Sequence, residues 1–172
     1  MERMGWSVLR YILAIIAVLF SATFYFIFKP LTIWLSYGIL SLFFTKVMVA
    51  GNLIFVNQVS VEIIPACVGG SAYLLLVLLN LLTPNLKFIK RIWIFLLAST
   101  MFLVLNLIRL NISIAFLEAG NNLFFKTHIV FWYVSIAFVV LIWFLCIKIF
   151  KIKDVPVYSD IKRILKSVKK HR

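Results

Sequence analysis

Long apolar stretches are the feature that most constrains the fold of this chain. Hydrophobic residues make up 65% of its 172 residues, and the mean hydropathy is +1.12. A soluble domain of this size does not bury so much apolar surface, so a bilayer is the expected solvent. Two of the stretches are shorter than the ~20 residues that a spanning helix needs. Five stretches are predicted as transmembrane helices: residues 9–28, 31–44, 70–83, 92–112 and 129–150.

The positions of the basic residues predict how these stretches are oriented. Nine of the 18 Lys and Arg residues lie between Lys148 and Arg172, and positive-inside counting places this tail in the cytoplasm. The 84–91 loop then falls inside and the 45–66 segment outside, with thirteen basic residues inside and five outside. Five spans put the amino terminus outside, and re-entry of the second stretch would reverse that end. The net charge of +13 is thus interpreted as orientation and contact with membrane lipids, and no nucleic acid is expected as a partner.

The expected organisation is a multi-pass membrane domain, residues 1–150, followed by a basic cytoplasmic tail, residues 151–172. The predicted fold class is all-α integral membrane: a bundle of about five transmembrane helices, with a short external hairpin before Cys67 and an amphipathic tail. β-Branched residues around Gly51-Asn52 favour the hairpin over a helix that continues through Lys46. The tail has apolar residues at helical spacing, which predict a helix on the inner headgroups: Ile161, Ile164, Leu165 and Val168.

Three reactive side chains stand near ends of stretches that the charge pattern places on the outer face. Cys67 precedes the third stretch, where a helix amino terminus lowers a thiol pKa and offers N–H groups to an oxyanion; a small buried cysteine is the alternative. Arg109 lies ~27 Å along a helix from Arg91, and it either snorkels or faces the bundle interior. His128 opens the last stretch, whereas His171 lies in the tail; an interfacial histidine without a role is the alternative.

A polar stripe favours an inward-facing Arg109. Asn106, Arg109 and Ser113 follow one another at i, i+3 and i+7, on one face of a helix otherwise made of Leu, Ile and Phe. A charge this close to hydrocarbon is costly unless it faces the bundle interior or snorkels. Asn106 and Ser113 are therefore expected to support Arg109 in the interior.

Four residues around Cys67 are further candidates for this site. Gly69 and Gly70 permit an unusual turn or the close approach of a substrate backbone. Glu62, five residues before Cys67, is a candidate to orient the site, with a water-facing side chain as the alternative. Tyr73 is a candidate hydroxyl donor, with plain packing as the alternative. No cluster of His, Cys, Asp and Glu has metal-ligand spacing, so neither a metal nor another cofactor is expected.

Together these residues resemble the exosortase and archaeosortase family of multi-pass membrane cysteine transpeptidases. The resemblance covers residues 59–140 and depends on the order and spacing of its parts. Many members have Ser or Thr directly after the cysteine, whereas this chain has Val68. The matching parts are Ala66-Cys67 with Gly69 two residues on, then Asn106-Leu107-Ile108-Arg109-Leu110, then His128.

The resemblance implies an activity and its partners. Cys67, Arg109 and His128 would be the catalytic residues of a peptidase at the extracytoplasmic side of the plasma membrane. Its substrates would be secreted proteins with a carboxy-terminal recognition motif, transmembrane helix and basic tail. A thioester would carry each cleaved protein to an amine or lipid acceptor. The alternatives are a non-catalytic membrane assembly or scaffold protein and, with less support from the residues, a small transporter.

Overall fold

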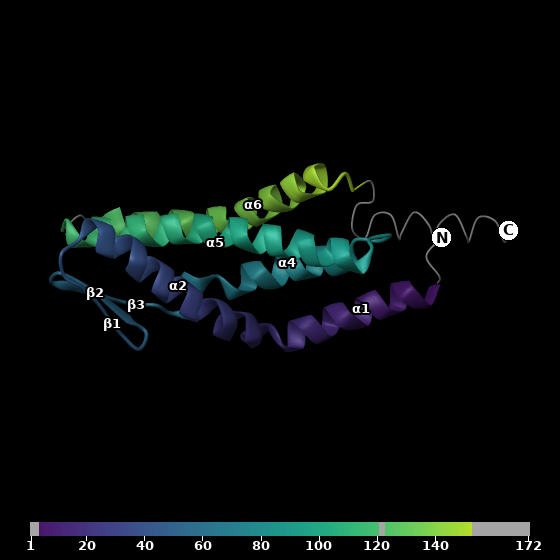
Figure 1. The fold of residues 1–172 in the computed structure, drawn as a ribbon, viewed down its shortest axis with the longest axis horizontal. Helices are drawn as coiled ribbons and strands as arrows, with labels where there is room; N and C mark the ends of the chain where they lie inside the picture. Colours follow the sequence, from purple (N-terminus) through teal and green to yellow (C-terminus); the bar gives the residue numbers. More distant parts are fainter. Residues whose placement is uncertain (1–3, 121–122, 153–172) are drawn as a thin grey trace.

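The computed structural model describes residues 4–120 and 123–152, which are mostly helical with a small sheet near one end (Figure 1). Two helices, α2 and α5, are long and apolar enough to cross a membrane. The predicted helix in the tail lies outside the described residues. The elements are α1 Met4–Leu19, α2 Ser21–Phe43, β1 Val47–Ala50, β2 Leu53–Val56, β3 Val59–Glu62, α3 Pro65–Val68, α4 Gly70–Leu82, α5 Phe88–Glu118 and α6 Leu123–Ile149.

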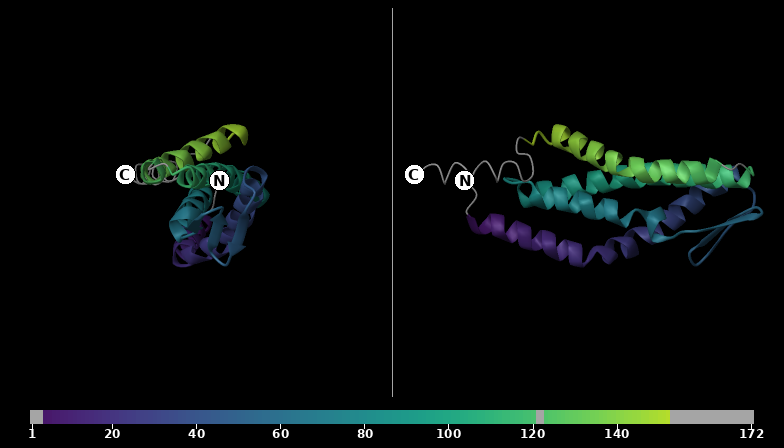
Figure 2. Two further views of the ribbon diagram at one scale, coloured as in Figure 1. Left: turned by 90° about the vertical axis from the view of Figure 1, so that its left-hand side faces the viewer. Right: turned by 180° about the vertical axis from the view of Figure 1, so that it is seen from behind.

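The first two helices run along the molecule in the same direction. The chain bends at Phe20, and α2 continues from there toward the sheet (Figures 1 and 2). The predicted boundary between the stretches 9–28 and 31–44 is wrong, because Pro30 lies inside α2. Proline has no N–H to donate within a helix, and near it the Thr32 hydroxyl donates to the carbonyl of Phe28 at 2.9 Å. The carbonyl that loses its backbone donor at Pro30 is that of Phe26, four residues earlier, so the Thr32 bond does not replace the missing one.

Because α1 and α2 run in the same direction, the start of α1 and the end of α6 lie at the same end of the molecule (Figure 1). Helix α4 runs antiparallel to α1 and α2: Arg10 donates to the carbonyl of Leu82 at 3.3 Å, and Phe28 stacks on Tyr73 near the start of α4. Helix α5 then runs toward the sheet and α6 returns (Figure 2). The described residues therefore pass along the molecule four times, and a bundle of about five transmembrane helices is not shown. The start of α1 lies at the same end as the end of α6, not at the opposite end as expected.

Two arginines close α4 at this end of the molecule. Arg91 donates to the carbonyls of Leu81 and Thr83 at 3.2 and 2.8 Å and also to that of Asn80. The side chain of Asn80 donates in return to the Arg91 carbonyl at 2.7 Å. Together with Arg10, these contacts satisfy carbonyl groups that the end of a helix leaves free. We call this region the basic end, defined by Arg10, Lys87, Lys90, Arg91, Lys148 and Lys151.

The three strands form an antiparallel meander in the order β1-β2-β3 at the opposite end, which we call the sheet end. Two-residue turns join the strands, and each contains a residue in the left-handed region, Gly51 with φ 62° and Asn57 with φ 50°. The predicted hairpin is thus confirmed and extended by a third strand, so the all-α class is corrected. Asn57 also donates to the Glu118 carboxylate at 2.7 Å, which joins the sheet to the end of α5.

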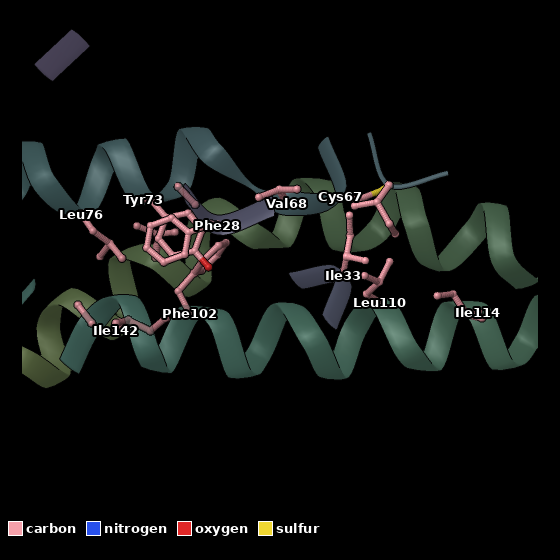
Figure 3. Close-up of a cluster of buried hydrophobic side chains, with 14 of the residues drawn as sticks. Phe28, Ile33, Cys67, Val68, Tyr73, Leu76, Phe102, Leu110, Ile114 and Ile142 are labelled. Carbon is pink, nitrogen blue, oxygen red and sulfur yellow. The ribbon is translucent and has the colours of Figure 1, made fainter. Parts of the chain in front are cut away.

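The core runs along α2, α3, α4, α5 and α6, and a cluster of its side chains is shown in Figure 3. The sheet contributes Ile54 and Val56, which are both fully buried. The outward faces of the helices are also apolar, and Trp34, Trp93 and Phe144 are 60%, 59% and 61% exposed. Soluble monomers rarely expose contiguous apolar surface on this scale, so the helices suit an apolar surrounding.

Candidate active site

Cys67 lies in the short helix α3, between the sheet and α4. Pro65 begins this helix, and Gly69 ends it with φ 73°, so the chain turns sharply into α4. A Cβ atom on Gly69 would lie 3.0 Å from the ring of Phe102, which is tighter than an ordinary contact, so the ring would have to shift to admit a larger residue. The Cys67 side chain is 7% exposed and belongs to the same buried cluster as Leu110 (Figure 3).

Asn106 attaches this turn to α5. Its Nδ2 atom donates to the carbonyl of Cys67 at 2.8 Å and lies 3.4 Å from that of Val68. The Asn106 side chain is 3% exposed, so water does not compete for the bond. The sequence predicted Asn106 as a support for Arg109, and the structure shows it holding the backbone of the cysteine.

Arg109 lies one helical turn further along α5 and faces the interior. Its side chain is 8% exposed, and Ser113, on the same stripe, is 2% exposed. The Ser113 hydroxyl donates to the Arg109 carbonyl within the helix at 2.9 Å. The inward-facing stripe is therefore confirmed, and snorkelling of Arg109 is wrong.

The Cys67 thiol and the Arg109 guanidinium are close enough to interact by charge. Burial raises the pKa of the Cys67 thiol, whereas a backbone hydrogen bond at Ile64 and the positive charge of Arg109 act to lower it. The net direction is upward, because burial outweighs the two effects that lower the pKa. Arg109 opposes part of the cost of forming a thiolate in this buried position.

A cavity of about 990 Å³ is lined by Arg109 and by residues on either side of Cys67, whereas Cys67 itself is not among the lining residues. Arg109 lines it together with Pro65 and Ala66, which directly precede Cys67, and with Tyr133 and Ser135 of α6. The remaining walls are mostly apolar and come from α2, α4, α5 and α6. An apolar cavity with a few polar groups at one place is typical of ligand-binding sites.

His128 lies in the first turns of α6, and the structure does not describe its side chain. Helix α6 runs antiparallel to α5, and its Tyr133 shares a cavity wall with Arg109. Since His128 precedes Tyr133 by five residues, its backbone lies ~7.5 Å further toward the sheet end by helical rise. The structure thus brings Cys67 and Arg109 together, and a role for His128 beside them stays a prediction.

Two of the predicted supporting residues differ in their relation to the cavity. Glu62 is exposed on β3 between the buried side chains of Val61 and Ile63, so it faces outward and away from the core. The water-facing alternative for Glu62 is therefore the one that the structure favours. Gly70 lines the cavity at the start of α4, where a Cβ atom would meet the backbone of Tyr25 at 3.6 Å, an ordinary contact.

Tyr73 is a packing residue in this structure. It is fully buried, stacks on Phe28 with ring centroids 3.5 Å apart, and meets Phe102 edge-on at 5.0 Å. Among the described residues, no hydrogen-bond partner reaches its hydroxyl group. Of the two alternatives for Tyr73, packing is thus favoured over hydroxyl donation.

Tyr133 and Ser135 were not among the predicted site residues. Ser135 borders Arg109 in the large cavity and in a second one of about 80 Å³ that also includes Asn106. Seven residues separate His128 from Ser135, so the two positions share one helix face, and this spacing was a usable signal in the sequence. No such signal marked the tight contact between Gly69 and Phe102, because it joins distant segments.

This chain matches no protein-family model, no curated protein and no solved structure. The resemblance to exosortases and archaeosortases therefore stays a prediction that depends on its residues.

Proposed function

We propose that this protein is an integral membrane cysteine transpeptidase, similar to the exosortases and archaeosortases. It would cleave carboxy-terminal sorting signals of secreted proteins and transfer them to an acceptor. The observation that carries this proposal is the pairing of Cys67 with a buried Arg109 beside a large, mostly apolar cavity. Burying a charged guanidinium in a membrane helix costs free energy, and charged residues at such positions are typically functional.

The charge distribution supports insertion with the basic end in the cytoplasm. Among the described residues, the basic end carries six Lys and Arg and no carboxylate, whereas both described carboxylates, Glu62 and Glu118, lie at the sheet end. Four passes put the start of α1 and the end of α6 on the same side. The basic residue Arg10 then agrees with the positive-inside rule, which it opposed in a five-span arrangement.

This orientation puts the site below the extracytoplasmic surface. Arg109 precedes the end of α5 by nine residues, which corresponds to ~14 Å along the helix. The sheet packs over the same end of the bundle and joins α5 through the bond from Asn57 to Glu118. A substrate would therefore enter from the membrane side, through the cavity, rather than from above the sheet.

The cavity walls suit the transmembrane helix of a sorting signal. Small residues allow close approach of a second helix, and they line the cavity at the starts of α2 and α4. An apolar segment in this cavity would bring the peptide bond before it close to α3. The small lining residues are Ser21, Ala22, Gly70, Ser71 and Ala72.

The proposed reaction is acyl transfer through a thioester. The Cys67 sulfur attacks the scissile carbonyl as His128 accepts the thiol proton, and Arg109 stabilises the negative oxygen of the tetrahedral intermediate. Collapse of the intermediate breaks the C–N bond, and His128 returns the proton to the leaving amine. An acceptor amine or lipid hydroxyl then attacks the thioester and releases Cys67 as a thiol.

Co-expression with secreted proteins that carry candidate sorting signals tests this function. Wild type and Cys146→Ala are expected to process the substrate, because Cys146 is fully buried in α6 at a distance from the cavity. Cys67→Ala is expected to abolish processing, and Arg109→Gln and His128→Ala to lower it strongly. If Cys67→Ala processes as well as wild type, the transpeptidase proposal fails.

A non-catalytic membrane assembly protein is the second candidate. The burial of Cys67, which raises its pKa, favours this reading because a thiol that stays protonated is a poor nucleophile. In that case Cys67→Ala would leave both folding and the association with partner proteins unchanged. The two candidates differ in whether a covalent adduct forms on Cys67.

A further inference from the structure

Another cavity opens at the basic end, far from Cys67. Its volume is about 300 Å³, which lies at the lower limit for sites of small ligands. The loop between α4 and α5 forms one wall, and the residues that follow α6 form the other. Three lysines from these two segments line it: Lys87, Lys90 and Lys151.

The lysines have no carboxylate near them among the described residues. The two described carboxylates, Glu62 and Glu118, both lie at the sheet end of the molecule. The neighbouring Arg91 is already engaged with the carbonyl groups that end α4. Three lysines that line one cavity repel one another, so the cavity favours an anion.

The backbone around the cavity adds to its positive potential. Lys87 precedes the first turn of α5, which has no side-chain cap, so the N–H groups of that turn are directed toward this end. Lys151 follows α6 with φ 50°, a left-handed conformation that strains any residue other than glycine. The chain therefore holds a lysine at a position where glycine would be easier to accommodate.

The surroundings of the cavity indicate a lipid as the source of the anion. Beside the lysines, α5 exposes Phe88, Ile89 and Trp93, which are 78%, 58% and 59% exposed. Apolar and aromatic side chains next to lysines are typical of the boundary between headgroups and acyl chains. An acyl chain could lie on this face of α5 while its headgroup enters the cavity.

We propose that this cavity binds the phosphate group of an anionic membrane lipid. The phosphate would accept hydrogen bonds from the three lysines and join the loop before α5 to the end of α6. The inference is independent of the chemistry at Cys67.

Mass spectrometry of the intact, full-length protein in a mild detergent tests this site. The protein is titrated with phosphatidylglycerol or phosphatidylcholine, and bound lipid is counted. Each lysine contributes about fivefold to the affinity for an anionic headgroup, so the variant Lys87→Gln/Lys90→Gln/Lys151→Gln is expected to bind phosphatidylglycerol about a hundredfold more weakly. Binding of phosphatidylcholine is expected to be weak in both proteins.

Two matched controls separate the cavity from net charge. The variant Lys166→Gln/Lys169→Gln/Lys170→Gln loses the same charge in the tail and is expected to bind phosphatidylglycerol like wild type. Lys148→Gln, outside the cavity, is likewise expected to have less effect than Lys151→Gln. Equal losses in cavity and control variants would overturn the proposal, as would equal binding of the two lipids. If inorganic phosphate alone stabilises wild type but not the cavity variant, a soluble phosphate is the ligand, and the lipid is overturned as its source.

Discussion

The bond from Asn106 to the Cys67 carbonyl gives the sharpest prediction about the site. Its length of 2.8 Å is that of a normal hydrogen bond, whereas the contact with Val68 at 3.4 Å is marginal, so one bond is counted. Asn106→Ala leaves a buried carbonyl without a partner, which costs about 1–3 kcal/mol. Opening of the α3 turn should therefore become about 5–150 times more frequent.

The rate at which a small, uncharged alkylating reagent labels Cys67 measures this opening. The experiment uses protein that carries Cys146→Ser, so that only Cys67 reacts. The matched control is Asn111→Ala, because Asn111 is also buried on α5 but donates to the Leu107 carbonyl of its own helix at 2.7 Å, with only a long contact of 3.5 Å to the Ser36 hydroxyl of α2. Asn106→Ala is expected to speed labelling, and Asn111→Ala to leave it within a few-fold of the parent. Equal rates in the two variants would refute the role given to Asn106.

Three further predictions follow from burial and backbone geometry. Gly69→Ala should lower thermal stability by about 1–2 kcal/mol because of its positive φ, while Gly38→Ala, with no atom near the added Cβ, should be neutral or stabilising; equal midpoints would contradict this. Tyr73→Phe should leave the unfolding midpoint unchanged or raise it, because the buried hydroxyl has no partner among the described residues, and a clear loss of stability would point to a missed bond. Burial raises the pKa of Cys67 and the charge of Arg109 lowers it, so alkylation of Cys67 should reach its midpoint above the usual thiol pH, and Arg109→Gln should move that midpoint higher; a downward shift would contradict the pairing.

Local patterns predicted the elements better than their arrangement. The turn at Gly51-Asn52 indicated where the hairpin would reverse, and Gly51 adopts a positive φ. The polar stripe of Asn106, Arg109 and Ser113 correctly indicated an inward face, because helical periodicity fixes which side chains share a side. These inferences need only the geometry of one element.

The direction of each pass could not be obtained in the same way. Lys29-Pro30 is a strong sequence signal for a helix end, yet α2 continues through it and the chain bends at Phe20 instead. Tertiary contacts decide this, since Phe28 packs on Tyr73 and thereby holds the region around the proline against α4. Because the prediction put a chain reversal near Lys29-Pro30, it placed all residues before that point at the opposite end of the molecule. Arg10 was therefore predicted at the sheet end, whereas it lies at the basic end.

The proposed function requires a covalent bond between the substrate and Cys67, and mass spectrometry of the digested protein detects that bond directly. Protein incubated with a signal-bearing peptide is quenched in acid, digested and examined for an acyl group that hydroxylamine removes. A hydroxylamine-sensitive adduct on the peptide that contains Cys67, absent in Cys67→Ala, is the predicted result. Cleavage of the substrate with no adduct on Cys67, or with an adduct on Cys146, would contradict the proposed function.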